Sequence, residues 1–116
     1  MTSNSTRIAI IGAGGFAREV LDVLEAWGDR YIVEGFVVDA AYGRPGDVIN
    51  GRPVLGGREW LKAHRDDVVA VCGIGAPEVR RRLVQAAARD GVRFASVIHP
   101  SVISTRWVTV GSGSVI

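Results

Sequence analysis

A glycine cluster near the N-terminus constrains the fold more than any other feature of the sequence. The apolar run RIAIIG (7–12) leads directly into GAGGFA (12–17), and from Phe16 onward apolar residues recur at helical spacing. Gly12, Gly14 and Ala17 match the pattern G-x-G-x-x-G/A. A strand, a glycine turn and a helix in this order predict the first unit of a parallel α/β sheet.

The chemistry of such a turn favours an anionic ligand. The first glycine permits the tight turn, the second lets the backbone approach a phosphate, and the small third residue allows the helix to pack on the strand. The amides and the positive dipole at the start of the helix then face the phosphate. Gly12, Ala13, Gly14, Gly15 and Phe16 therefore form a candidate phosphate-binding loop. The alternative interpretation is that the glycines only make a sharp turn.

Strand-like and helical patterns alternate along the rest of the chain. We expect strands at 31–39, 67–75 and 93–100, and helices at 16–27, 57–64 and 77–90. Segment 40–57 is typical of a loop, with turns at RPGD (44–47) and NG (50–51). The alternation predicts an α/β fold, a Rossmann-like, doubly wound parallel sheet.

Other candidate residues reach the same edge of the predicted sheet. Asp39 ends the second expected strand, where dinucleotide-binding proteins carry an acidic residue, although it comes later than the usual spacing of about 20 residues. The segment GIGAP (73–77) follows the third strand, so Gly75 and Ala76 open at the carboxyl edge beside the first loop. Arg80 is placed to reach an anion there, whereas at least two arginines of the run RRR are expected on a solvated helix face.

Composition excludes several classes of function. The net charge of +2 is small and scattered, which argues against nucleic-acid and membrane-surface partners. A single cysteine, Cys72, excludes a disulfide framework and a cysteine-rich zinc site, and fits a reducing cytoplasm. No signal peptide or membrane span is expected. His64 and His99 have no carboxylate or nucleophile near them in sequence, so we assign no catalytic constellation and no metal site.

The C-terminal segment 101–116 follows a different pattern. It has no helical period, and Val110 and Ile116 stand six residues apart, as in one turn of a hexapeptide-repeat β-helix. A solenoid needs about three stacked repeats to bury its core, so we expect the chain to be part of a longer protein. The expected organisation is a Rossmann-like domain over 1–100 and the first hexapeptide-like coil of a β-helix over 101–116.

The order of these segments resembles a known family. The resemblance rests on IIGAGGFAREVLDVLEAWGD, GFVVD, INGRPVLGG, GIGAPEVRRRL and RFASVIHPSVISTRWVTVGSGSVI. Together they are similar to the N-terminal domain of NeuD/PglD-type sugar acyltransferases, the nucleotide-sugar acetyltransferases with a left-handed β-helix. The resemblance implies a domain that binds a UDP- or dTDP-linked amino or deoxy sugar. It also implies a β-helix beyond residue 116 that binds acetyl-CoA, forms a homotrimer and holds the catalytic histidine.

By this resemblance the nucleotide site comprises the first loop and the other candidates above. These are Gly12, Ala13, Gly14, Gly15, Phe16, Asp39, Gly75, Ala76 and Arg80, and no catalytic residue falls within this chain. Two positions depart from the family pattern. Phe16 stands where members commonly have histidine, which removes a polar contact from that corner, and Ser104 replaces an aliphatic residue of the first coil.

Two other functions are compatible with the same loop. The glycine pattern is also that of an NAD(P)-binding domain of an oxidoreductase or redox sensor, although the sequence shows neither a substrate domain nor a catalytic residue for that chemistry. A non-catalytic nucleotide-binding module is the other alternative. Continued six-residue periodicity with an embedded histidine after residue 116 would favour the acyltransferase.

Overall fold

A computed structural model describes residues 5–95 of the 116-residue chain. Its five-stranded sheet has the order β3-β4-β2-β1-β5. The strands are β1 (Thr6–Ile11), β2 (Tyr31–Val37), β3 (Val48–Ile49), β4 (Arg52–Gly56) and β5 (Val69–Cys72). The helices are α1 (Gly15–Ala26), the short 3-10 helix η1 (Gly28–Arg30), α2 (Arg58–Ala63) and α3 (Pro77–Arg89).

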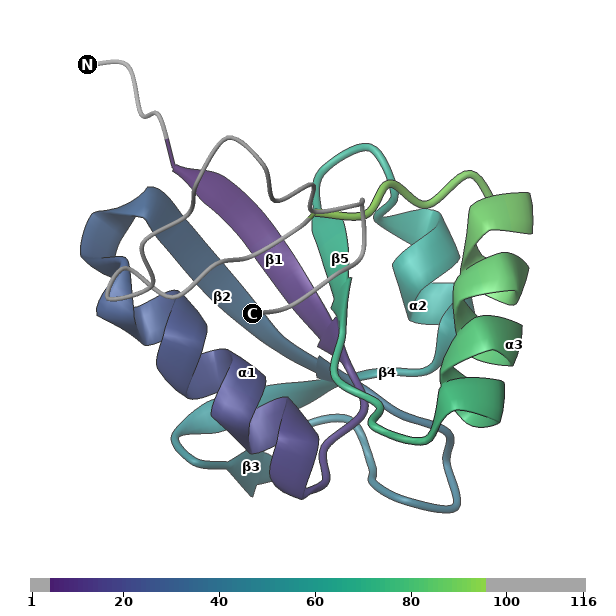
Figure 1. The fold of residues 1–116 in the computed structure, drawn as a ribbon, viewed down its shortest axis with the longest axis horizontal. Coiled ribbons are helices and arrows are strands. Elements are labelled where there is room, and N and C mark those ends of the chain that lie inside the picture. The colour runs from purple at the N-terminus through teal and green to yellow at the C-terminus, as the bar shows by residue number, and fades with distance from the viewer. Residues whose placement is uncertain (1–4, 96–116) are drawn as a thin grey trace.

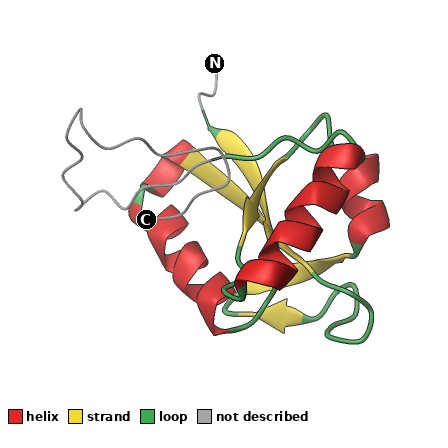
Figure 2. Ribbon diagram, turned by 45° about the vertical axis from the view of Figure 1, so that its right-hand side comes forward, coloured by secondary structure: helices red, strands yellow, loops and turns green. Residues whose placement is uncertain are grey.

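The sheet is parallel except at one edge. Strand β1 pairs in parallel with β2 and with β5, and β2 pairs in parallel with β4. Only β3 runs antiparallel, as the hairpin partner of β4. Helix α1 lies on one side of the sheet, and α2 and α3 lie on the other (Figure 1; Figure 2). The predicted Rossmann-like, doubly wound α/β fold is confirmed.

The sequence of β1 explains why helices cover both faces. Ile8 and Ile10 belong to the apolar cluster beneath α1, whereas Ala9 and Ile11 belong to the cluster beneath α2 and α3. Because alternate residues of a strand point to opposite faces, a strand buried on both sides is apolar throughout. Helix α1 completes its cluster with one buried stripe, comprising Ala17, Val20, Leu21 and Leu24.

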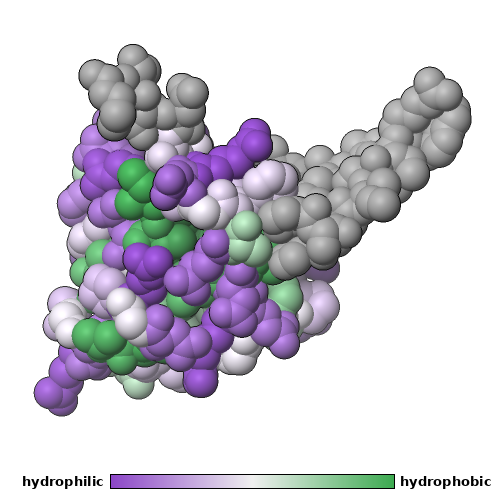
Figure 3. Space-filling view, turned by 90° about the vertical axis from the view of Figure 1, so that its left-hand side faces the viewer, coloured by the Kyte–Doolittle hydropathy of each residue, from purple (hydrophilic) through white to green (hydrophobic). Residues whose placement is uncertain are grey.

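The outer face of α1 is polar. Arg18, Glu19, Asp22 and Glu25 are exposed on this helix. Seen from the α1 side, the surface is mainly hydrophilic, and apolar residues show only in small areas between charged ones (Figure 3). The helix is therefore amphipathic, as its spacing predicts.

The helix boundaries follow the predicted signals. The glycine after α1, Gly28, has a positive φ of 61°, and the glycine after α3, Gly91, has a φ of 83°. Pro77 occupies the first turn of α3. Proline suits that position because its missing N–H would have no helical partner there. Helix α2 also lies within the predicted 57–64 segment.

The prediction of a loop over 40–57 was wrong, because this segment contains β3 and β4. Asn50 and Gly51 have φ angles of 49° and 80°, as a two-residue hairpin turn requires. The RPGD turn is confirmed: Asp47 N–H donates to the Arg44 carbonyl at 3.0 Å. Pro53 and the surrounding glycines obscured β4 in the sequence, since both residue types are poor strand formers.

The predicted strand at 93–100 is described only at its start. Phe94 forms an isolated parallel bridge with Ala70 of β5. Ala70 N–H donates to the Arg93 carbonyl at 2.8 Å, and Ala95 N–H donates to the Ala70 carbonyl at 3.0 Å. The expected domain boundary at residue 100, the β-helix coil and His99 lie outside the described residues.

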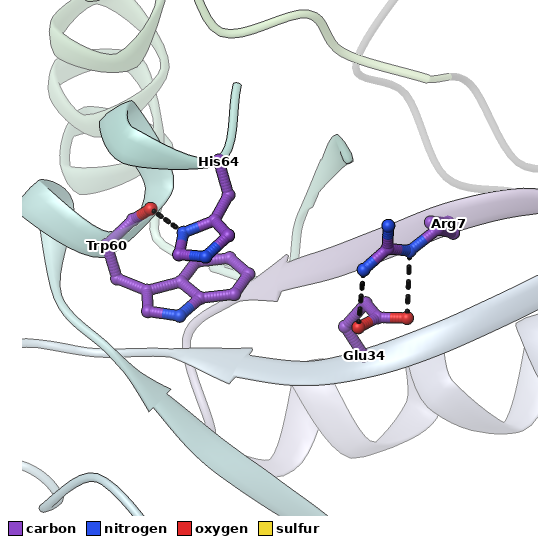
Figure 4. A network of polar contacts seen from close by, with 4 residues as sticks. All are labelled: Arg7, Glu34, Trp60 and His64. Atoms are coloured by element: carbon purple, nitrogen blue, oxygen red, sulfur yellow. Dashed lines mark hydrogen bonds and ion pairs between the residues drawn. The ribbon is translucent and has the colours of Figure 1, made fainter. Parts of the chain in front are cut away.

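Two side-chain pairs lie on the face of the sheet that carries α2 (Figure 4). The Arg7 guanidinium of β1 donates to both carboxylate oxygens of Glu34 in β2, at 3.1 and 3.2 Å. His64 stacks on Trp60 with ring centroids 4.0 Å apart, and its Nδ1 lies 2.8 Å from the Trp60 carbonyl oxygen. His64, the residue that follows α2, is partly buried.

Candidate functional site

The two glycine loops meet where β1 and β5 end. Gly12 N–H donates to the Val37 carbonyl, and Gly73 N–H donates to the Ile11 carbonyl, both at 2.8 Å. Gly12 has a φ of 100°, and a Cβ there would lie 2.6 Å from Ile74 Cδ1. Glycine is thus required at position 12 both by the backbone conformation and by the neighbouring loop.

Gly14 differs from Gly12 because nothing in the protein requires a glycine there. Its φ is −80°, and a Cβ added at Gly14 or at Gly15 would have no atom within 4 Å. Gly14 is the N-cap of α1, with no side-chain cap and no acidic residue in the first turn of the helix. The first N–H groups of α1 therefore have no side-chain acceptor, and the space over Gly14 is open.

A cleft of about 770 Å³ crosses this edge of the sheet. Four predicted site residues line it: Gly12, Ala13, Gly14 and Asp39. The cleft lies where the chain leaves β1 toward β2 and later returns to β5 on the other side. Open α/β sheets bind ligands at such a switch point. The full lining comprises Ile11, Gly12, Ala13, Gly14, Val37, Val38, Asp39, Tyr42, Ile49, Arg58, Leu61, Ile74, Val79, Arg82, Leu83, Ala86 and Ala87.

The other five predicted site residues are not part of the cleft lining. These are Gly15, Phe16, Gly75, Ala76 and Arg80. Phe16 Cβ is 3.9 Å from the position that a Cβ on Gly75 would take, so the structure brings these two loops into contact. Phe16 also packs against the apolar cluster beneath α1.

Sequence reasoning missed several residues of the cleft. Val79 lies three and four residues before Arg82 and Leu83, and Ala86 lies four and three residues after them, which places all four on one face of α3. This spacing was a usable signal for Arg82. Tyr42 and Arg58 carried no such signal, because the path of segment 40–57 was not predicted.

An ion pair holds Arg58 at the border of the cleft. Its guanidinium donates to both carboxylate oxygens of Asp90, at 2.6 and 3.1 Å. The Arg58 side chain is 60% exposed, whereas that of Asp90 is only 10% exposed. The hydrogen bond from Arg58 lowers the pKa of the Asp90 carboxyl, and the same contact raises the pKa of Arg58 above its ordinary value. Both groups are therefore charged at neutral pH.

The lining of the cleft is suited to binding a small molecule. It combines apolar surface with one carboxylate, one phenol and two guanidinium groups, and has no histidine, cysteine, serine or lysine among the described residues. Between residues 5 and 95, no group of three or more His, Cys, Asp or Glu is placed to hold a metal ion. Cys72, the single cysteine, is buried in β5. No helix in the described part of the chain is long and apolar enough to cross a bilayer.

Comparison with known proteins identifies the family. The PglD N-terminal domain family matches residues 7–87, which include the glycine loop, Asp39 and most of α3. The chain belongs to this family. The predicted resemblance is thereby confirmed.

Relatives of this PglD N-terminal domain are sugar acetyltransferases. A UDP-N-acetylbacillosamine N-acetyltransferase from Bacillus subtilis is 25% identical over 94% of this chain and 50% of its own length. The structure of a variant of perosamine N-acetyltransferase from Caulobacter crescentus, with CoA and GDP-perosamine, is 30% identical with a TM-score of 0.79. The match covers 94% of this chain and 50% of that one.

A third relative is the acetyltransferase domain of PglB from Neisseria gonorrhoeae, solved with acetyl coenzyme A. It is 28% identical with a TM-score of 0.77, over 96% of this chain and 52% of that one. The chain therefore spans about half the length of each of these relatives. The comparisons favour the acyltransferase family over the NAD(P)-dependent oxidoreductase.

Proposed function

We propose that this PglD N-terminal domain binds the nucleotide part of a nucleotide-linked sugar for an acetyl-CoA-dependent sugar acyltransferase. The observation that carries the proposal is the start of α1, where the N–H groups lack a side-chain acceptor beneath the open space at Gly14. A helix N-terminus with accessible backbone amides attracts phosphate. The cleft is also within the size range of small-molecule sites.

The substrate we propose is a nucleoside diphosphate carrying an amino sugar. Two of the relatives named above are N-acetyltransferases, one named for a UDP-linked sugar and the other solved with a GDP-linked sugar. We therefore add GDP to the UDP and dTDP expected from the sequence. Asp39 would accept hydrogen bonds from ribose hydroxyls, the role that an acidic residue at this strand end has in dinucleotide-binding folds.

In the proposed reaction this domain contributes positioning. Acetyl-CoA, when bound, supplies the acyl group as a thioester. The sugar amine attacks the thioester carbonyl, the C–S bond breaks, the thiol of CoA leaves, and a base removes the proton from nitrogen. Holding the nucleotide at Gly14 and Asp39 fixes the amine against the thioester, which lowers the entropic part of the barrier.

We assign the remaining parts of the activity to a β-helix that follows this domain. That region would hold acetyl-CoA, the catalytic histidine and the trimer contacts, and the enzyme would work in the cytoplasm. We assign no catalytic group to the described residues, since the cleft lining has no histidine, cysteine, serine or lysine. Acetylation of a nucleotide-linked amino sugar by a full-length protein with this domain would support the assignment. Failure with every UDP-, dTDP- and GDP-linked amino sugar supplied would overturn it.

The domain itself is tested by calorimetric titration of the 116-residue chain with UDP, dTDP, GDP and NAD. We expect binding of at least one nucleoside diphosphate, and preferential binding of NAD would overturn the proposal. Gly14→Ala should weaken the binding of the nucleotide by about tenfold, because the added methyl group would obstruct the approach of the phosphate to the backbone amides of α1. Unchanged nucleotide affinity in a folded Gly14→Ala variant would contradict the assignment of the phosphate to this turn.

A further inference from the structure

We propose that Arg82 binds the second phosphate of the nucleoside diphosphate and so makes the site specific for diphosphates. This inference rests on the proposed function and adds a residue and a direction to it. The ligand would cross the cleft with its nucleoside beside Asp39 and its outer phosphate beside α3. The sugar would then leave the cleft on the α3 side.

The position of Arg82 is the first argument. It lines the cleft together with Val79, Leu83 and Ala86, which share its face of α3. Arg81 and Arg82 are both exposed, but only Arg82 is part of the lining. Within residues 5–95, Arg82 forms no ion pair with a carboxylate. It thus brings a positive charge to an otherwise apolar wall.

The distribution of charge along the cleft is the second argument. Asp39 on the opposite wall repels a phosphate and favours hydroxyl or N–H donors. The start of α1, marked by Gly14, attracts the first phosphate. Arg58 also borders the cleft, but Asp90 already accepts two hydrogen bonds from it. Arg82 is consequently the lining cation without a carboxylate partner in the described part of the chain.

The chemistry of the side chain is the third argument. A guanidinium presents a planar fork of donors that pairs with two phosphate oxygens at once. Val79 and Leu83 beside it are partly buried, whereas Arg82 is exposed, so its guanidinium is accessible to a phosphate in the cleft. A monophosphate held at α1 would leave this fork unused. The site should therefore distinguish nucleoside diphosphates from monophosphates.

The test compares three variants by calorimetric titration with two ligands. These are the nucleoside diphosphate that the wild-type chain binds and the monophosphate of the same nucleoside. Arg82→Ala should weaken the binding of the diphosphate by about 10- to 100-fold, as expected for a hydrogen bond to a charged group. It should change the affinity for the monophosphate by less than about twofold. Arg82→Lys should recover part of the loss. Arg81→Ala removes the same charge from the adjacent residue, and it should leave the affinities for both ligands within about twofold of the wild-type values.

The outcomes separate this inference from the proposed function. Equal losses in the Arg82→Ala and Arg81→Ala variants would mean that only net charge matters, and would overturn the inference. Equal weakening of mono- and diphosphate by Arg82→Ala would overturn it as well. In either case the proposed function stands, because the wild-type chain still binds the nucleotide. Absence of binding to the wild-type chain would overturn both. Thermal unfolding of each variant confirms that the compared proteins are folded.

Discussion

Gly73, at the end of β5, lies directly against Ala17 in the first turn of α1. A Cβ on Gly73 would stand 2.8 Å from both Cα and Cβ of Ala17, which is itself fully buried. The small third residue of the glycine motif therefore packs against the loop after β5 as well as on its own strand. The motif and the second glycine loop are parts of one packing unit at the edge of the sheet.

This contact predicts a loss of stability in Gly73→Ala. The added methyl group cannot move away from the Ala17 backbone, so we expect the free energy of unfolding to fall by about 1–3 kcal/mol, as in other overpacked cores. Urea denaturation measures this. Gly75→Ala is the control in the same loop, because its added Cβ would make only an ordinary contact of 3.9 Å with Phe16. A Gly73→Ala variant as stable as Gly75→Ala would show that the two loops are not tightly packed.

A second prediction concerns Gly35, which sits at an irregularity between β1 and β2. Ala9 pairs with Gly35 whereas Ile8 pairs with Val33, so Glu34 is an extra residue in β2. Gly35 has a φ of 151°, and a Cβ there would collide with the Pro53 carbonyl of β4. Gly35→Ala should therefore lower the free energy of unfolding by about 3 kcal/mol or more, since backbone strain and collision add.

Gly46→Ala separates these two contributions. Gly46 also has a positive φ, of 94°, but a Cβ there would have no atom within 4 Å. Its substitution should cost only the backbone strain, about 1 kcal/mol. Equal destabilisation by Gly35→Ala and Gly46→Ala in urea titrations would show that the approach of β4 to Gly35 is not a tight one.

Local signals made the glycine turn and the helix ends predictable from the sequence. Gly12, Gly28 and Pro77 act through their own backbone geometry, which depends little on distant residues. Strand β4 was not predictable in this way. Pro53 and its neighbouring glycines disfavour a strand locally, and the pairing of Val54 with Phe36 in β2 overrides that preference. Long-range pairing of this kind leaves no signal in a short window.

The residues of the candidate site also differ in whether local sequence signals could predict them. Asp39 was predictable because it follows a strand of the sheet. The choice between Arg80 and Arg82 depends on how α3 is turned toward the cleft, which is set by packing of Leu83 and Ala87 against the sheet. An apolar residue three positions before Arg82 and another four positions after it would have favoured this arginine.

Asp39 supplies a third prediction, which depends on the proposed function. If its carboxylate accepts hydrogen bonds from ribose hydroxyls, Asp39→Ala should weaken the binding of a ribonucleoside diphosphate by about tenfold. The same substitution should have much less effect on the 2′,3′-dideoxy analogue, which lacks those hydroxyls. Titration of both ligands into both proteins gives the coupling between Asp39 and the ribose. Equal losses for the two ligands would place Asp39 elsewhere than at the ribose.

The Arg58–Asp90 pair predicts how stability depends on pH. The hydrogen bond from Arg58 lowers the pKa of the Asp90 carboxyl below its ordinary value of 3.8. Because the folded pKa is lower than the unfolded one, the pair contributes its full stability above the ordinary pKa and loses it as the pH falls through the lowered value.

The free energy of unfolding of the wild type should therefore exceed that of Asp90→Asn by a constant amount near neutral pH. The two values should converge below about pH 4. Added salt should reduce the difference at neutral pH, since the Arg58 side chain is 60% exposed. A difference unchanged down to pH 2 would show that Asp90 stabilises the end of α3 by some means other than its charge.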